Sequence, residues 1–219
     1  MIDDGETRPP SAGTDARTPA KPTPNRRTAR VKFWCNLVGY QIVWFSAVIG
    51  ASRGLWWSGV VAAGTFAILH LALVRQTRTQ RVVDIRLMAV AIGCGLLMDG
   101  SLSLSGLAHY AAGDIALPSG GAPLWILSMW AAFALTLRHS MTFLLNRTLL
   151  AAVFGGIGGP LAYLGASRGW QAINFAEPRW AALLTLAIGW GIAILLLTTR
   201  AARWSKSGTA PTTGPGSAA

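Results

Sequence analysis

The sequence predicts an all-α, polytopic membrane protein: a bundle of six transmembrane helices with both termini in the cytoplasm. Of its 219 residues, 52% are hydrophobic and 12% are charged, whereas an average soluble domain carries about 25% charged residues. The apolar residues form long continuous runs without the period-two alternation of strands. The 19 Lys and Arg exceed the 8 Asp and Glu and lie mostly outside those runs. We therefore expect membrane lipids, and no nucleic acid, as partners.

The chain divides into three parts by composition. Residues 1–32 are rich in Pro, Thr, Ala and Arg without an apolar run, and residues 201–219 are rich in Ser, Gly, Thr, Pro and Ala. Such segments cannot bury enough apolar surface to fold, so both are predicted to be disordered tails around a membrane domain at 33–200. No short apolar segment with a small-residue cleavage site precedes Phe33, so we expect no cleaved signal peptide.

Six stretches of the membrane domain are long enough to span a bilayer, which takes about 20 largely apolar residues. The fourth is the shortest, and Arg138 and His139 stand at its end. The stretches are 33–51, 56–74, 86–107, 123–139, 148–166 and 180–199.

The basic residues predict the orientation of these spans. The alternate connections at 52–55, 108–122 and 167–179 hold only Arg53, Arg168 and Arg179, while the other 16 of the 19 lie in the N-terminal tail, 75–86, 138–147 and the C-terminal stretch. Because basic residues accumulate on the cytoplasmic side, both termini are predicted to be cytoplasmic. Trp44, Trp130 and Trp190 fall deep within spans, where we expect them to pack.

Asp99 is the acidic residue that this map places inside the membrane. It falls about 20 Å into the third span, near or just past the midplane, and no Lys or Arg lies at that depth in another span. An ionisable group there costs about 2.5–3.5 kcal/mol, so we expect a protonated Asp99 that donates a hydrogen bond to a neighbouring span.

The fifth span offers a partner for Asp99. Pro160 lacks an N–H and frees the carbonyl of Gly156, and the surrounding glycines allow another helix to approach closely. We expect a broken helix here, with Asp99 donating to a freed carbonyl or to Tyr163. The candidate intramembrane site is thus Asp99, Gly156, Gly159, Pro160 and Tyr163. Two interpretations remain open: a structural tether, or a proton or substrate site of the kind found at discontinuous helices of transporters.

A second polar cluster is predicted near the cytoplasmic side. Its members fall at the cytoplasmic ends of the first, second and fourth spans and could converge on a shallow pocket; they are Asn36, Tyr40, Gln41, His70, Arg138 and His139. Alternatively, Arg138 extends to the headgroups and His70 bonds a neighbouring helix. Two His on separate helices can ligate a metal or haem, but no paired spacing is present, and we predict no metal site and no cofactor.

Other catalytic patterns are weak. His109 and Asp114 have the H-x-x-x-x-D spacing of acyltransferases, in which a carboxylate orients a His as general base, but they lie in an outer loop without the other motifs of that family. The glycine run of the fifth span has no Gly-Lys-Ser/Thr and follows no strand, so it is not a phosphate loop. The catalytic residues therefore remain unknown.

Taken together, the motifs resemble a family of bacterial inner-membrane proteins catalogued as domain of unknown function 2878. The resemblance covers residues 33 to 200 and lies in Asn36-Leu37-Val38-Gly39-Tyr40-Gln41 with Trp44, His70-Leu71, Asp99-Gly100-Ser101-Leu102, Thr136-Leu137-Arg138-His139-Ser140 and Gly155-Gly156-Ile157-Gly158-Gly159-Pro160-Leu161-Ala162-Tyr163. The resemblance implies a multi-pass protein of the bacterial inner membrane and supplies no activity. Some members are encoded near lipid-modifying enzymes, an association that favours a link to lipid or envelope metabolism.

Three classes of function fit these observations. An accessory or structural membrane protein is favoured, because no complete catalytic constellation is present. A small transporter would use Asp99 facing the Gly/Pro break. A membrane-embedded lipid-modifying enzyme would use His70, Arg138 and His139. A polar path past Asp99 would favour the transporter, and an opening to lipid beside the two His would favour the enzyme.

Overall fold

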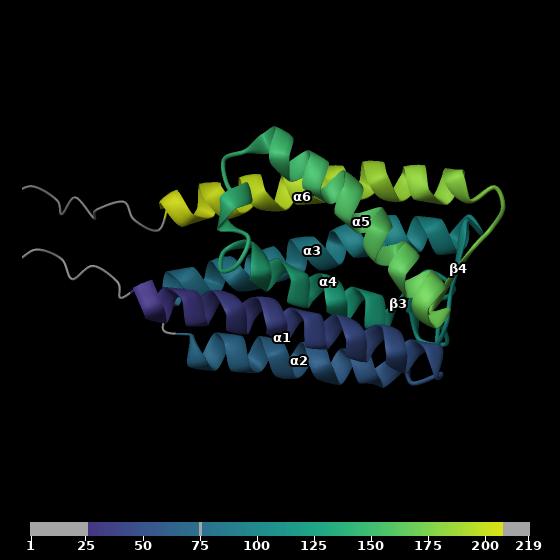
Figure 1. Cartoon of the computed structure of the whole chain (residues 1–219), viewed down its shortest axis with the longest axis horizontal. Coiled ribbons are helices and arrows are strands. Elements are labelled where there is room, and N and C mark those ends of the chain that lie inside the picture. Colours follow the sequence, from purple (N-terminus) through teal and green to yellow (C-terminus); the bar gives the residue numbers. More distant parts are fainter. Residues whose placement is uncertain (1–25, 75, 208–219) are drawn as a thin grey trace, which may run out of the picture.

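Six α-helices run back and forth along one axis in the computed structural model, which describes residues 26–74 and 76–207 (Figure 1). The helices are α1 (Arg26–Ser52), α2 (Trp56–Leu73), α3 (Arg78–Leu104), α4 (Leu124–Leu137), α5 (Thr148–Trp170) and α6 (Arg179–Ser207), with a 3₁₀ turn η1 (Thr142–Leu144). The start of α1 and the end of α6 lie at the same end of the bundle, which we call the tail end.

Four short strands close the opposite end, which we call the strand end. β1 (Ala108–Tyr110) pairs antiparallel with β4 (Ile173–Phe175), and β2 (Ala116–Leu117) pairs antiparallel with β3 (Ala122–Pro123). The first pair joins the α3–α4 connection to the α5–α6 connection. This end is therefore a folded cap rather than a set of free loops.

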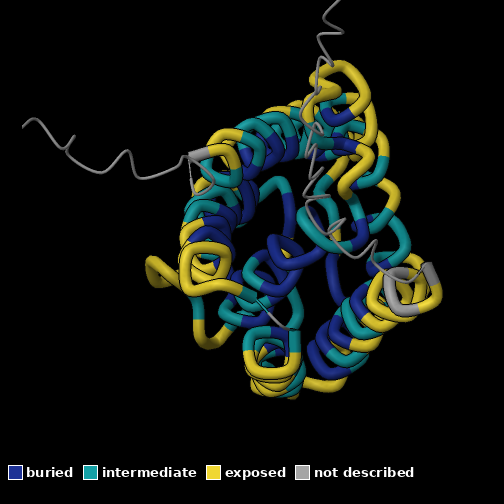
Figure 2. The backbone as a smooth tube through the Cα atoms, turned by 90° about the vertical axis from the view of Figure 1, so that its left-hand side faces the viewer, coloured by how far each residue is buried: buried dark blue, intermediate teal, exposed yellow. Residues whose placement is uncertain are grey.

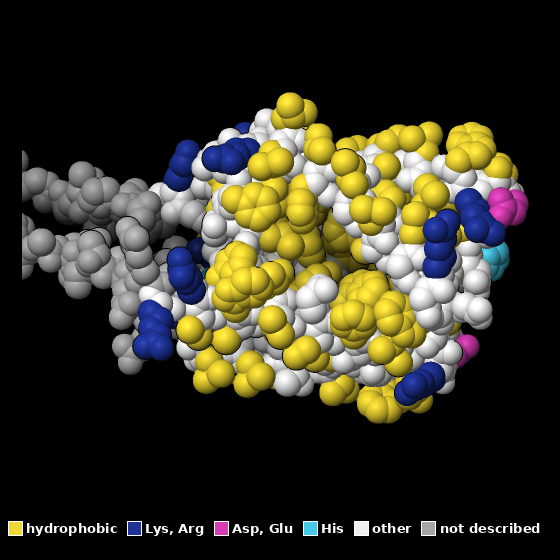
Figure 3. Space-filling view, in the orientation of Figure 1, with side chains coloured by type: hydrophobic (Ala, Val, Ile, Leu, Met, Phe, Trp, Pro, Cys, Tyr) yellow, Lys and Arg dark blue, Asp and Glu magenta, His cyan; other side chains and the backbone are white. Residues whose placement is uncertain are grey.

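The predicted all-α bundle is confirmed, and five of its helices are long and apolar enough to cross a membrane: α1, α2, α3, α5 and α6. α4 has 14 residues and is shorter than a usual span. Apolar side chains cover the middle of the face seen in Figure 3, and Lys and Arg lie toward its two ends. The chain is thus an integral membrane protein.

Several helix boundaries differ from prediction. α1 begins at Arg26 and α6 ends at Ser207, so the predicted tails 1–32 and 201–219 are helical over 26–32 and 201–207. These turns lie next to long apolar helices and are rich in Arg, Lys and Ala, which are good helix formers. Extending a helix that already exists costs little. Residues 1–25 and 208–219 lie outside the described residues.

α3 begins eight residues before the predicted span, because a capping box starts it. The Thr77 hydroxyl accepts from the backbone N–H of Gln80, and the Gln80 side chain accepts from the N–H of Thr77. The additional turns place Asp84 on a helix. At its other end α3 stops at Leu104, so Asp99 lies only about 8 Å from that end. Asp99 is therefore nearer the strand end than the midplane position predicted for it.

α4 occupies the centre of the bundle. Most of its side chains are buried, and the view along the axis in Figure 2 shows buried backbone at the centre and exposed faces on the outside. The outward faces of the surrounding helices carry many exposed apolar residues, among them Leu73, Leu97 and Leu149. A central helix surrounded by apolar outer faces is the arrangement expected of a bundle in lipid.

α5 is continuous through Pro160, so the predicted broken helix is wrong. A single proline removes one backbone hydrogen bond, which neighbouring groups in a membrane helix can compensate. The glycines allow α6 to pack closely instead: a Cβ at Gly155 would overlap the backbone of Trp190, and one at Gly159 would overlap its indole. Gly156 likewise lies against the carbonyl of Ala187 on α6.

Candidate functional site

A cleft of about 280 Å³ lies between α1, α4, α5 and α6, and we call it the lateral cleft. Figure 3 shows the surface hollowed between large apolar side chains, in the region flanked by α1 and α5 in Figure 1. Its lining is mostly aromatic, aliphatic and glycine. It consists of Tyr40, Gln41, Trp44, Met129, Trp130, Phe133, Met141, Phe154, Gly155, Gly158, Gly159, Ala162, Tyr163, Trp190 and Ile194.

Asp99 holds two residues of this lining in place. Its Oδ1 accepts hydrogen bonds from the hydroxyls of Tyr163 at 2.5 Å and Tyr110 at 2.8 Å. Its Oδ2 accepts from the indole N–H of Trp130 at 2.7 Å, and the Trp130 ring stacks on Trp190 at 4.1 Å between centroids. Asp99 is 0% exposed, so the carboxylate ties α3, α4, α5 and β1 together beside the cleft.

Asp99 and Tyr163 are in contact, as expected, but the direction of the hydrogen bond differs from the prediction. Asp99 was expected to donate, whereas the hydroxyls of Tyr163 and Tyr110 and the indole N–H of Trp130 all donate to it. An indole N–H can only donate. Burial raises the pKa of Tyr110 well above its usual range, and the opposing Asp99 raises it further, so this phenol stays protonated and able to donate. Asp99 is thus an acceptor surrounded by three donors, which favours the interpretation of Asp99 as a structural tether between helices.

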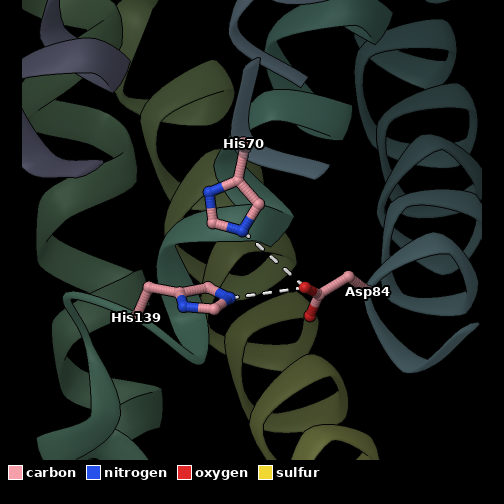
Figure 4. A group of neighbouring side chains, drawn as sticks. All are labelled: His70, Asp84 and His139. Carbon is pink, nitrogen blue, oxygen red and sulfur yellow. Dashed lines mark hydrogen bonds and ion pairs between the residues drawn. The ribbon is translucent and has the colours of Figure 1, made fainter. Parts of the chain in front are cut away.

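Asp84 forms a second buried polar centre, about 9 Å from the start of α3 at the tail end. Its Oδ1 lies 2.5 Å from the guanidinium of Arg138. Its Oδ2 lies 3.3 Å from Nε2 of His139 and 3.7 Å from Nε2 of His70, and Figure 4 shows both rings directing a nitrogen at the carboxylate. Asp84 is 0% exposed, while the side chains of Arg138 and His139 are 11% and 20% exposed.

Further hydrogen bonds orient this centre. The Asn36 amide nitrogen lies 3.4 Å from Nδ1 of His70 and donates to the carbonyl of Leu135. The Asn36 oxygen accepts from the Ser140 hydroxyl at 2.7 Å. Arg138 also donates to the carbonyl of Gln80. α1, α2, α3 and the turn after α4 are thus joined through side chains.

The structure brings together four of the six residues predicted for the cytoplasmic-side cluster: Asn36, His70, Arg138 and His139. Tyr40 and Gln41 line the lateral cleft instead. His109 and Asp114 are both exposed, and no hydrogen bond or ion pair joins them in the part of the chain that the structure describes. The acyltransferase-like pair therefore has no geometric support.

Sequence reasoning missed Asp84 and Tyr110, and it expected Trp130 to pack without predicting its hydrogen bond to Asp99. The signal for Asp84 was the capping box of Thr77 and Gln80, which moves the helix start upstream and places Asp84 beside the apolar Val83 and Leu87. Tyr110 reaches Asp99 from a strand at the bundle end, and no periodicity in the sequence points to that contact.

A family model described as "Protein of unknown function (DUF2878)" matches residues 33–196. No curated protein and no solved structure matches the chain. The matched range includes the lateral cleft, Asp99 and the polar centre around Asp84.

Proposed function

The chain belongs to the DUF2878 family of proteins of unknown function, and we propose that it is a non-enzymatic accessory protein of the bacterial inner membrane that holds an acyl chain of a membrane lipid in the lateral cleft. The observation that carries this proposal is the cleft itself: an apolar hollow of about 280 Å³ whose walls belong to the bundle helices. The proposed function is therefore the retention of a lipid, and through it a role in lipid or envelope metabolism.

The proposal takes all six helices as spans, with both termini in the cytoplasm. The helices alternate in direction, and the start of α1 and the end of α6 lie together, as an even number of crossings requires. α4 is short, but it is buried among the other helices, where irregular backbone at its ends is tolerated at membrane depth. The excess of basic residues in the tail-end connections supports a cytoplasmic position for that end.

A lipid chain suits the cleft by position and chemistry. The cleft opens between helices whose outer faces are apolar, and its entrance includes the exposed Phe154 of α5. A hollow at this level is in contact with lipid hydrocarbon. Apolar burial there leaves no polar backbone unsatisfied, since the walls are helices.

The polar groups support an accessory role over the two alternatives. Asp99 is held by three donors, and α5 is unbroken, which removes the discontinuous helix of the transporter hypothesis. The enzyme hypothesis requires an opening to lipid beside His70 and His139. Neither residue lines the lateral cleft, so the cleft does not meet that requirement.

Filling the cleft is expected to reduce lipid retention. Gly158 lines the cleft, and a Cβ there meets no atom within 4 Å, so Gly158→Phe places a ring in free space. We expect several-fold less lipid per protein after purification in mild detergent, measured by native mass spectrometry and lipid extraction.

Gly64→Phe on α2 is the matched control. Its Cβ also meets nothing within 4 Å, it is exposed, and it lies outside the cleft, so lipid retention should equal that of the unaltered protein. Equal retention in Gly158→Phe, Gly64→Phe and the unaltered protein would contradict the proposed function.

A further inference from the structure

We propose that His70, Asp84 and His139 form a binding site for a divalent first-row transition-metal ion, for which Zn²⁺ is the best fit. The three residues come from α2, α3 and the turn after α4, and their ligand atoms all lie within 4.8 Å of one another. The inference is independent of lipid binding in the lateral cleft and uses none of its residues.

The distances suit a tetrahedral ion. With bonds of about 2.0–2.1 Å, neighbouring ligand atoms of tetrahedral Zn²⁺ are about 3.3 Å apart. His139 Nε2 lies 3.3 Å from Asp84 Oδ2, and His70 Nε2 lies 3.7 Å from the same oxygen. Small rotations of the two rings would bring the ligand nitrogens of His70 and His139, which lie within 4.8 Å of each other, to the same separation. Two imidazoles and a carboxylate are also the ligand set of catalytic zinc sites, which keep a further position open.

Neighbouring side chains are placed to orient the proposed ligands of the ion. Arg138 binds Oδ1 of Asp84 and leaves Oδ2 facing the two rings, so it orients the carboxylate without covering the ligand oxygen. Asn36 contacts Nδ1 of His70, which leaves Nε2 of that ring facing Oδ2 of Asp84. Hydrogen bonds of this kind set which nitrogen of a ligating His faces the metal.

Gln76 supplies a second, independent observation. Its Oε1 is buried and has no hydrogen-bond partner among the described residues, while its Nε2 lies 3.4 Å from Nε2 of His70. Rotating this amide exchanges the two atoms and directs the orphan oxygen at the space beside His70. There the oxygen serves as the fourth ligand of the ion or bonds a water on the ion.

The position allows an ion to enter from the aqueous side. The centre lies in the first turns of α3 at the tail end, and the His139 side chain is 20% exposed. Asp84 and Asp99 are both fully buried, but Asp99 lies near the strand end.

The test is Zn²⁺ titration of the full chain in detergent after chelator treatment, by calorimetry. We expect one Zn²⁺ per chain, with affinity lowered at least about tenfold in His70→Asn and in His139→Asn. His109→Asn is the matched control, because His109 is the one His of the chain outside the proposed site and lies exposed in β1. The Zn²⁺ affinity of this variant should equal that of the unaltered protein. Equal affinity in the unaltered protein and a His70→Asn/His139→Asn double variant would overturn the proposal.

Co²⁺ absorption of the unaltered protein provides a measurement that needs no variant. A tetrahedral site of nitrogen and oxygen ligands gives intense visible bands with Co²⁺, which added Zn²⁺ abolishes. Weak, octahedral-type bands together with no stoichiometric Zn²⁺ binding would overturn the proposal even if the variants fail to fold.

Discussion

Asp84→Asn is expected to lower the free energy of unfolding by about 3–5 kcal/mol. The substitution keeps the shape of the side chain but leaves the guanidinium of Arg138, which is only 11% exposed, without its anion. A buried charge that loses its partner retains its desolvation cost and loses the attraction that offset it. Unfolding in detergent, with a chelator present so that metal binding plays no part, measures the loss.

A second substitution tests whether the unpaired charge of Arg138 causes the loss of stability. Asp84→Asn combined with Arg138→Gln removes both charges, and the double variant should recover at least half of the lost stability, since no isolated charge remains. A loss below about 1 kcal/mol in the single variant, or a double variant no more stable than the single, would show that the ion pair does not hold this end of the bundle.

Asp99→Ala is expected to cost about 2–4 kcal/mol of unfolding free energy, because it leaves the donors of Tyr110, Tyr163 and Trp130 buried and unsatisfied. Hydrogen bonds in membrane proteins are individually weak, so the estimate depends on losing three at once. Asp99→Asn keeps one acceptor oxygen and should lose less. The same unfolding measurement applies.

Asp114→Ala is the control for Asp99. Asp114 is an exposed Asp of the strand end, and its replacement should change stability by no more than about 0.5 kcal/mol. If Asp99→Ala costs no more than Asp114→Ala, the tether beside the cleft is not supported, and a role for Asp99 other than a structural one would have to be sought.

Length and hydropathy were sufficient to predict the helices, because a long apolar run in lipid must satisfy its backbone hydrogen bonds internally and does so as an α-helix. They were insufficient at the helix ends: Arg26 to Lys32 continue α1, since solvated polar turns can extend a helix that packing already stabilises. The capping box at Thr77 shows that local signals can correct such a boundary when they are examined residue by residue.

The sites were harder to predict because their contacts are long-range. Asp99 was found from its cost in the membrane, and Tyr163 from its place in the Gly/Pro segment of the fifth span. Tyr110, by contrast, reaches Asp99 across a chain reversal that hydropathy does not describe. Asp84 stood in an expected loop, where an acidic residue needs no partner. The cleft depends on how α1 and α5 diverge around α4, which no single segment encodes.

The most direct test of lipid uptake is photocrosslinking with a lipid that carries a photoreactive group on its acyl chain, followed by peptide mapping. α4 is buried by its neighbours, and its Met129 and Phe133 line the lateral cleft, so an acyl chain reaches them only by entering it. We predict crosslinks on α4 at these residues. Crosslinks confined to the exposed outer residues, such as Leu73, Leu97 and Leu149, with none on α4, would contradict lipid binding in the cleft.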